Sequence, residues 1–292
     1  MGVSENFKAF ANNLRTTNHS IVSDRCKSIT KRINLDFRKI DSSTLNSRYV
    51  GSYGRGTAIK GFSDVDILIV LPPDMYKKYN SYVGNGQSAL LQAVRNSIKL
   101  TYPNTEIGGD GQVVVVNFSD GIKFEIVPAF LNEGGESYTY ADSNNGGSWK
   151  VCKPIIEIAA INEQNKIYNK KVKHLVRMIK SWKNKNNVPI SGLLIETLVM
   201  NFMKDWVYND KSYIYYDFMV RDFFKYLSEC DPKQEYWLAW GSKQYVWRRD
   251  NFEYKAKQAY KTTIEAIEYD GKDYTYSAKE KWQTIFGKSY TG

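Results

Sequence analysis

Two carboxylates, Asp64 and Asp66, stand at the start of the apolar segment 64–71. The β-branched residues of this segment predict a β-strand. Because side chains alternate between the two faces of a strand, both carboxylates are expected to point the same way. Neighbouring carboxylates repel each other unless a cation lies between them. Hard oxygen ligands of this kind favour Mg²⁺ or Mn²⁺ over zinc, so the pair predicts a site for one of these ions.

A turn that could hold phosphate precedes the carboxylate pair. Gly51 and Ser52 offer backbone N–H groups and a hydroxyl, and small residues let phosphate oxygens come close to the backbone. Arg55 adds a positive charge nearby. Together with a metal site, these residues predict binding of a metal-bound nucleoside triphosphate. The structural alternative is that Asp64 caps a helix and Asp66 faces solvent.

The segment from Gly51 to Asp66 resembles the nucleotidyltransferase signature of the DNA polymerase β-like superfamily, in which glycine and serine are followed by D-x-D. This resemblance implies a third carboxylate on a neighbouring strand. Glu125, within the apolar segment 122–130, stands where that carboxylate is expected. Many members of the superfamily carry Asp at this place, so Glu125 departs from their pattern. A plain exposed strand residue is the alternative for Glu125.

A longer pattern of residues resembles one family within this superfamily. The run Gly-Ser-x-x-Arg-Gly-Thr-Ala-Ile-x-Gly-x-Ser-Asp-Val-Asp resembles that of the bacterial relatives of cyclic GMP-AMP synthase and oligoadenylate synthase, the CD-NTases of anti-phage CBASS systems. Segment 175–183 resembles the spine helix of this family, and segment 191–196 resembles one of its helix starts. The resemblance implies that Lys180 and Ser191 contact the triphosphate. A solvated lysine and a simple helix cap are the alternatives for these two residues.

The resemblance implies a metal-dependent nucleotidyltransferase that joins nucleoside triphosphates, ATP among them, into a cyclic di- or oligonucleotide second messenger with release of pyrophosphate. It implies two Mg²⁺ or Mn²⁺ ions held by Asp64, Asp66 and Glu125. The side chains that would orient and neutralise the β and γ phosphates are those of Ser52, Lys180 and Ser191. Two alternatives stay open: a transferase that acts on an RNA end or a small-molecule acceptor, and an inactive nucleic-acid-binding protein.

Positive charge is concentrated in one region. The 292 residues include 41 Lys and Arg against 31 Asp and Glu, a net charge of +10. Ten of these basic residues, but only two acidic ones, lie between residues 150 and 190. Basic surfaces attract polyanions. Because bacterial CD-NTases generally need no nucleic acid, we expect Lys170 and Lys171 to bind polyanions weakly without controlling activity.

The pattern of apolar and turn-forming residues predicts an α+β fold. After N-terminal helices, strands are expected at 48–52, 64–71, 112–118 and 122–130, with a helix at 87–100. The stretch 134–148, rich in Gly, Asn and Ser, is the expected domain boundary. The helices expected beyond it are 168–183, 192–205, 216–230, 252–267 and 274–286. The sequence and the resemblance thus predict a polymerase β-like nucleotidyltransferase core at 1–150, a mixed sheet with flanking helices, and a mostly α-helical domain at 151–292 that completes the nucleotide cleft.

Cysteine and histidine chemistry is disfavoured. The three cysteines form no C-x-x-C pair, so neither a zinc site nor a disulfide framework is indicated. Two histidines give little support for Ser-His-Asp hydrolysis or a histidine metal site. No apolar run approaches the ~20 residues of a membrane helix, and no secretory signal is recognisable. A cytoplasmic protein without a membrane partner is therefore expected.

The segment 288–292 is polar and predicted to be flexible. Some CBASS operons encode a ubiquitin-activating-type enzyme that conjugates the synthase through its C-terminal residue, often Gly. The resemblance therefore implies operon partners, including a conjugating enzyme that acts at Gly292. An ordinary chain end is the alternative.

Overall fold

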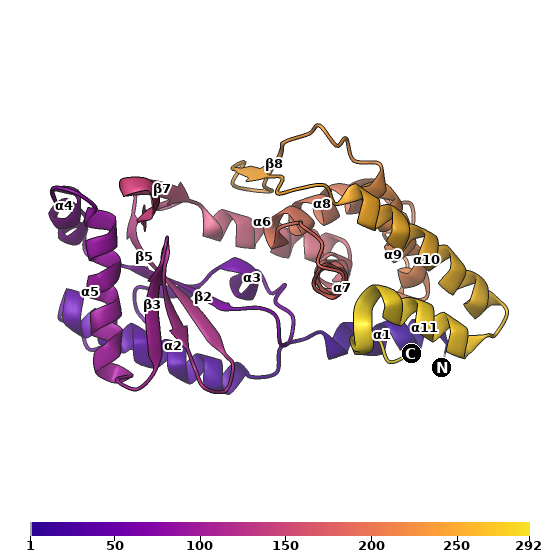
Figure 1. Ribbon diagram of the computed structural model, residues 1–292, viewed down its shortest axis with the longest axis horizontal. Coiled ribbons are helices and arrows are strands. Elements are labelled where there is room, and N and C mark those ends of the chain that lie inside the picture. Colours follow the sequence, from indigo (N-terminus) through magenta and orange to yellow (C-terminus); the bar gives the residue numbers. More distant parts are fainter. Residues whose placement is uncertain (1) are drawn as a thin grey trace. The chain divides into compact units, whose positions relative to one another are not determined.

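The computed structural model describes residues 2–292, which form two compact units (Figure 1). The helical unit comprises the residues up to 16, together with 56–62 and 159–292. The sheet unit comprises 17–55 and 63–158. The units therefore interleave along the chain, unlike the predicted halves at 1–150 and 151–292, because the first helix packs with the later helices.

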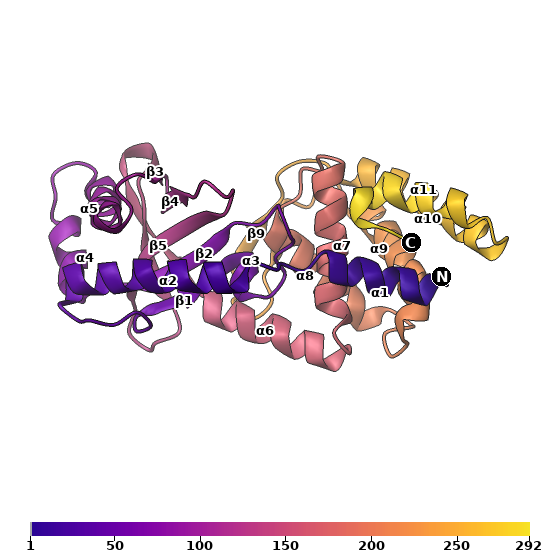
Figure 2. The same cartoon turned by 90° about the horizontal axis from the view of Figure 1, so that it is seen from below.

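A mixed sheet forms the centre of the sheet unit (Figure 2). Its strand order is β1-β2-β5-β4-β3, with β6 paired to β5 and β7 paired to β6. Only β2 and β5 run parallel, and every other pair is antiparallel. The strands are β1 (Ser47–Tyr49), β2 (Val65–Val70), β3 (Glu106–Asp110), β4 (Val113–Asn117), β5 (Lys123–Leu131), β6 (Tyr138–Asp142) and β7 (Ser148–Cys152).

Helices cover one face of this sheet. Ile29 of α2 and Val94 of α5 are fully buried in the same core as Ile67 of β2. On the opposite face, Leu68 of β2 and Ala129 of β5 belong to a smaller core. This central position explains the continuous apolar run of β2. The helices of this unit are α2 (His19–Ile33), the π-helix η1 (Asn34–Arg38), α3 (Gly51–Gly54), α4 (Pro73–Asn80) and α5 (Gly86–Thr101).

The helical unit contains the helices expected in the second half of the chain. Val172, Leu175, Val176 and Ile179 of α7 are fully buried, as their helical spacing predicts. A small hairpin of β8 (Tyr236–Leu238) and β9 (Tyr245–Trp247) was not expected. The helices are α1 (Val3–Asn13), α6 (Pro154–Ile167), which begins in the sheet unit, α7 (Lys171–Lys185), α8 (Gly192–Asp205), η3 (Tyr213–Tyr215), α9 (Tyr216–Ser228), α10 (Glu253–Gly271), α11 (Thr275–Phe286) and η4 (Gly287–Ser289).

Two local predictions are wrong. The expected boundary loop at 134–148 contains β6, because Tyr138 and Ala141 are buried in the sheet unit among the Gly and Asn residues that concealed them. The segment 288–292 is docked rather than flexible. Tyr290 is 1% exposed and contacts the ring of Phe7, while its backbone carbonyl accepts a hydrogen bond from Gln283 at 2.8 Å.

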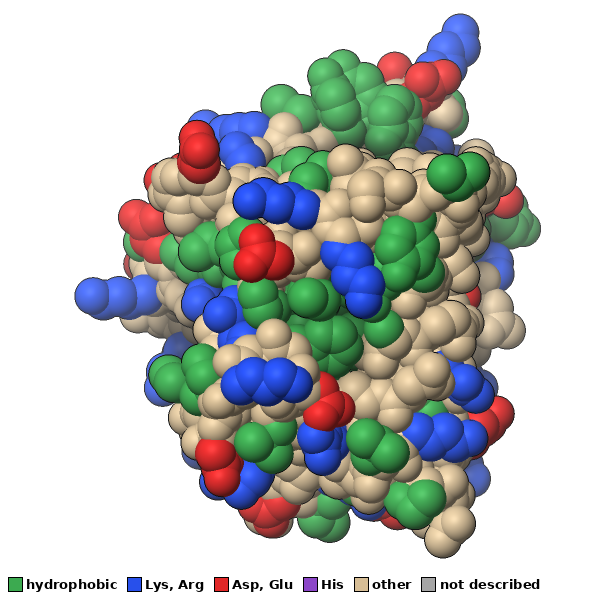
Figure 3. Space-filling view, turned by 90° about the vertical axis from the view of Figure 1, so that its left-hand side faces the viewer, with side chains coloured by type: hydrophobic (Ala, Val, Ile, Leu, Met, Phe, Trp, Pro, Cys, Tyr) green, Lys and Arg blue, Asp and Glu red, His purple; other side chains and the backbone are tan. Residues whose placement is uncertain are grey.

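Only some of the basic residues between 150 and 190 lie at the surface. Lys171 is 2% exposed, so it cannot bind a polyanion as expected, whereas Lys170 is exposed. On the face of the sheet unit shown in Figure 3, acidic and basic side chains are interspersed with apolar ones. Among residues 2–292, no helix is long and apolar enough to cross a membrane.

Candidate active site

The carboxylates predicted from the sequence lie at the starts of β2 and β5. Asp64 directly precedes β2, Asp66 is its second residue, and Glu125 is the third residue of β5. The parallel register places Asp66 opposite Glu125. Strand alternation puts Asp66 on the same face as Leu68, away from the core that α2 and α5 cover. The fold thus brings together three carboxylates from two adjacent strands.

A lysine that the sequence analysis missed lies among these carboxylates. Lys123 Nζ is 3.2 Å from Asp64 Oδ2 and 2.6 Å from Glu125 Oε1. Lys123 precedes Glu125 by two positions, so strand alternation alone could have placed the two side chains on one face.

The donor set at these strand ends fits a hard cation. Within residues 2–292, no group of His, Cys, Asp or Glu side chains is preassembled as a metal site, and the Lys123 ammonium connects Asp64 with Glu125. That ammonium is itself a cation held by oxygen donors. Oxygen donors without histidine or cysteine suit Mg²⁺ or Mn²⁺.

The surroundings of Asp66 disfavour the ionised form of its carboxylate. Burial, followed by repulsion from Glu125, raises the pKa of Asp66 to about 7. The positive charge of Arg55 and a hydrogen bond from the Ser52 backbone N–H act in the opposite direction. In the metal-free protein, Asp66 therefore keeps its proton to a higher pH than an ordinary aspartate does. A cation bound beside it would favour the ionised form.

Gly51 allows the backbone to approach Asp66. Its φ of +55° lies in the left-handed region. A Cβ atom at this position would lie 1.9 Å from Asp66 Oδ2. The expected strand at 48–52 therefore ends at Tyr49, and the chain turns through α3. The close approach to Asp66 is enough to explain why residue 51 is a glycine. Its role in phosphate binding stays a prediction.

Arg55 is held by a partner that sequence analysis did not identify. It is 9% exposed and its Nη1 lies 3.5 Å from Glu157 Oε2 of α6. The two residues are about a hundred positions apart in the chain, so local sequence patterns carry no signal for this pair. Arg55 still acts on Asp66 through its charge.

Lys180 and Ser191 belong to the helical unit. Lys180 is buried and donates hydrogen bonds to Glu196 Oε1 at 2.8 Å and to Thr57 Oγ1 at 3.0 Å. A solvated lysine is therefore the wrong alternative. Ser191 Oγ accepts a hydrogen bond from the Leu194 N–H at 3.1 Å, so Ser191 does cap α8. Glu196, a carboxylate inside an apolar helix, was a signal that sequence analysis overlooked.

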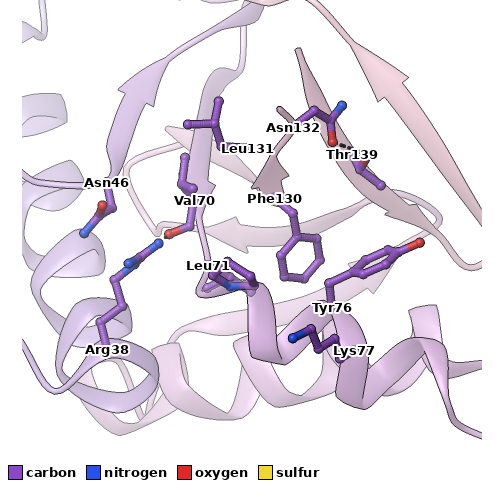
Figure 4. A pocket seen from close by; sticks show the side chains of 11 residues that line it. Arg38, Asn46, Val70, Leu71, Tyr76, Lys77, Phe130, Leu131, Asn132 and Thr139 are labelled. Atoms are coloured by element: carbon purple, nitrogen blue, oxygen red, sulfur yellow. Dashed lines mark hydrogen bonds between the residues drawn. The ribbon is translucent and has the colours of Figure 1, made fainter. Parts of the chain in front are cut away.

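A separate cavity of about 560 Å³ lies at the other ends of the same strands (Figure 4). Val70 and Leu71 at the end of β2, and Phe130 and Leu131 at the end of β5, line it. It contains none of the residues predicted for the nucleotide site.

The family described as Second Messenger Oligonucleotide or Dinucleotide Synthetase domain matches residues 1–165. A probable cyclic nucleotide synthase of Bacillus cereus (strain VD146) is 26% identical over 220 residues. That alignment covers 63% of this chain and 64% of the relative, so it spans slightly less than two thirds of the relative's length.

Solved structures share the fold over nearly the whole chain. CD-NTase CdnG of Bradyrhizobium diazoefficiens, solved with GTP, superposes with a TM-score of 0.70 at 10% identity, covering 97% of this chain and 94% of CdnG. CdnC of Escherichia coli MS115-1, solved with ATP, gives a TM-score of 0.66 at 16% identity, covering 99% and 98% of the two chains. CdnC in complex with HORMA-deltaN gives 0.65 at 15% identity with the same coverage. At these identities the likeness shows the fold, which is the predicted α+β fold.

Proposed function

Since the chain belongs to the family of Second Messenger Oligonucleotide or Dinucleotide Synthetase domains, we propose that it is a nucleotidyltransferase that makes a cyclic di- or oligonucleotide from nucleoside triphosphates. The observation that carries this proposal is the register that aligns Asp66 with Glu125 beside Asp64. The Bacillus cereus relative, described as a probable cyclic nucleotide synthase, supports it. The relatives solved with ATP and GTP support nucleoside triphosphates as substrates, ATP among them. The proposed setting is anti-phage signalling in the cytoplasm.

The proposed cofactor is a pair of Mg²⁺ or Mn²⁺ ions, which Asp64, Asp66 and Glu125 would hold. When bound, such ions supply Lewis-acid activation of the attacking hydroxyl and stabilise the leaving pyrophosphate. Residues beside the carboxylates orient them and the phosphate groups in this proposal. The Ser52 N–H orients the Asp66 carboxylate, and the Ser52 hydroxyl is proposed to orient phosphate together with Gly51.

Arg55, Lys180 and Ser191 are proposed as further phosphate contacts. The ion pair with Glu157 fixes Arg55, and the pair with Glu196 fixes Lys180. Ser191 stands at the N-terminus of α8, where backbone N–H groups attract anions. Each residue thus has a structural partner that holds it in one geometry, and its role toward nucleotide is an additional proposal.

The test is product formation from each nucleoside triphosphate alone and in pairs, with mass spectrometry and nuclease digestion of the products. We expect pyrophosphate release and a cyclic product with Mg²⁺ or Mn²⁺, and neither with EDTA, because the clustered carboxylates would repel a triphosphate unless metal ions lie between them. Duplex DNA or RNA should not be required. Product that appears only with an RNA end or a small-molecule acceptor would favour the alternative transferase, and full turnover in chelator would refute metal dependence.

We also propose that a conjugating enzyme from the same operon acts at Gly292. The complex of CdnC with HORMA-deltaN supports an operon partner in general but not this kind of partner. Because Tyr290 is docked in the helical unit, the enzyme would have to take Gly292 from an ordered segment. Deleting Gly292 should abolish the conjugate in a reconstituted reaction, whereas Lys288→Ala, at an exposed position, should not. Conjugate that still forms after the deletion would rule out Gly292.

A further inference from the structure

The ammonium group of Lys123 lies between Asp64 and Glu125, two of the residues proposed to hold the metal ions. We propose that Lys123 is a built-in counter-ion, which holds the carboxylates together in the metal-free protein and competes with the first metal ion for them. The inference rests on the proposed function in one respect, that these carboxylates are metal ligands. It adds that the chain itself sets the metal concentration at which the site fills.

The geometry supports a competing cation. Lys123, Glu125 and Asp66 occupy the same face of two paired strands, and Lys123 Nζ bridges Asp64 and Glu125 at 3.2 and 2.6 Å. The Lys123 side chain is 34% exposed. Its long, flexible stem can therefore move the ammonium into solvent without disturbing the core of the sheet unit.

The surrounding charges explain why a counter-ion is needed. Asp66 faces the site from β2, and Asp64 faces it from the position directly before β2. Glu125 faces the site from β5. Arg55 is another cation that acts on Asp66, but Glu157 is paired with it. Without the Lys123 ammonium, the three carboxylates would repel one another with little compensation. A divalent ion carries twice the charge of an ammonium and bonds to oxygen directly, so it can displace Lys123.

Because a metal ion has to displace the Lys123 ammonium, the apparent affinity of the carboxylates for the ion is lower. A site that is available for only a fraction of the time binds its ligand more weakly by that fraction. If the ammonium occupies the carboxylates about nine-tenths of the time, the measured dissociation constant rises about tenfold. Removing the ammonium while keeping the length of the side chain should reverse this effect.

The experiment is calorimetric titration with Mn²⁺ in the absence of nucleotide. We expect Lys123→Met to bind Mn²⁺ about tenfold more tightly than the natural chain, and Lys123→Arg, which keeps the positive charge, to remain within about twofold of it. Lys77→Met is the matched control, because Lys77 is an exposed lysine of the same unit that also pairs with a carboxylate, at 3.8 Å from Asp74. Its Mn²⁺ affinity should equal that of the natural chain.

Melting temperature gives a second readout. In EDTA, Lys123→Met should melt below the natural chain, and Mn²⁺ should raise its melting temperature by more than it raises that of the natural chain. Lys123→Gln replaces Lys123→Met if the latter does not fold. Equal Mn²⁺ affinity in the natural chain and the variant lacking the ammonium would overturn the inference.

Failure of the inference can be told apart from failure of the proposed function. Asp64→Ala combined with Asp66→Ala should abolish Mn²⁺ binding, which shows that the titration reports this site. Pyrophosphate release by the natural chain, with no gain of affinity in Lys123→Met, overturns the counter-ion alone. Tighter Mn²⁺ binding by Lys123→Met, with no pyrophosphate release from any nucleoside triphosphate, supports the counter-ion and refutes the proposed function.

Discussion

Asp66→Asn is expected to remove nearly all turnover while making the metal-free protein more stable. Loss of one carboxylate from a metal site should remove ~4 kcal/mol of transition-state stabilisation, which is about 10³-fold in rate. The amide keeps the shape of the side chain, and its oxygen can still accept the hydrogen bond from the Ser52 N–H. The rate is measured as pyrophosphate release with saturating Mg²⁺.

The gain in stability should depend on pH. The pKa of Asp66 is about 7 in the folded protein, above the ordinary value of 3.8. The folded state therefore holds a proton that the unfolded state has lost, so stability falls as the pH rises from about 4 to about 7. Asn cannot ionise, so the variant escapes this loss. A gain of 1 kcal/mol would raise the melting temperature by about 2–4 °C in a domain of this size.

Asp142→Asn is the matched control with the opposite sign. Asp142 lies in the same sheet, and its hydrogen bond from Lys150 holds its pKa down at about 2. Its ionised form stabilises the fold above the ordinary pKa, so Asn at this position should lower the melting temperature at pH 8. Melting curves in EDTA at pH 5 and pH 8 measure both effects. An Asp66→Asn protein that is less stable than the natural chain at pH 8, or fully active, would contradict this account of Asp66.

The parts of the site that sequence reasoning located depend on local spacing. Asp64 and Asp66 follow from alternation within one strand, and the buried face of α7 follows from helical spacing. The position of Glu125 was taken from a family resemblance, and the strand register shows it beside Asp66. The carboxylate pair and the buried helix face need no knowledge of how distant segments meet, whereas the place of Glu125 does.

The parts that escaped prediction depend on contacts between distant segments. Glu157 pairs with Arg55, and Lys180 contacts Thr57, across more than a hundred residues in each case. Lys180 also pairs with Glu196 of the next helix. Hydrophobic periodicity does not report which buried charges will meet, because a single sequence gives no partner for them. Composition also misled at Tyr290, whose polar neighbours concealed a buried aromatic ring.

Glu125→Ala is expected to lose about 10³-fold in rate, if Glu125 is the third metal ligand. Nucleotide binding should change much less, because Asp64 and Asp66 remain. Glu125→Asp shortens the side chain by one CH₂, and a misplacement of ~1 Å can cost ~10²-fold in rate. Its partial activity should be higher with Mn²⁺ than with Mg²⁺. Glu106→Ala, at an exposed glutamate of β3 in the same sheet, is the matched control and should retain full activity.

A structural role for Glu125 would give a different set of results. Glu125→Ala would then melt at a lower temperature with normal turnover per folded molecule. The proximity of Glu125 to Asp66 can be tested separately in the metal-free protein, whichever role Glu125 has. Because the negative charge of Glu125 helps to raise the pKa of Asp66, Glu125→Ala should bring that pKa closer to its ordinary value. The fall in stability between about pH 4 and pH 7 should then be smaller than in the natural chain. A fully active Glu125→Ala protein whose stability varies with pH as in the natural chain would remove Glu125 from the site.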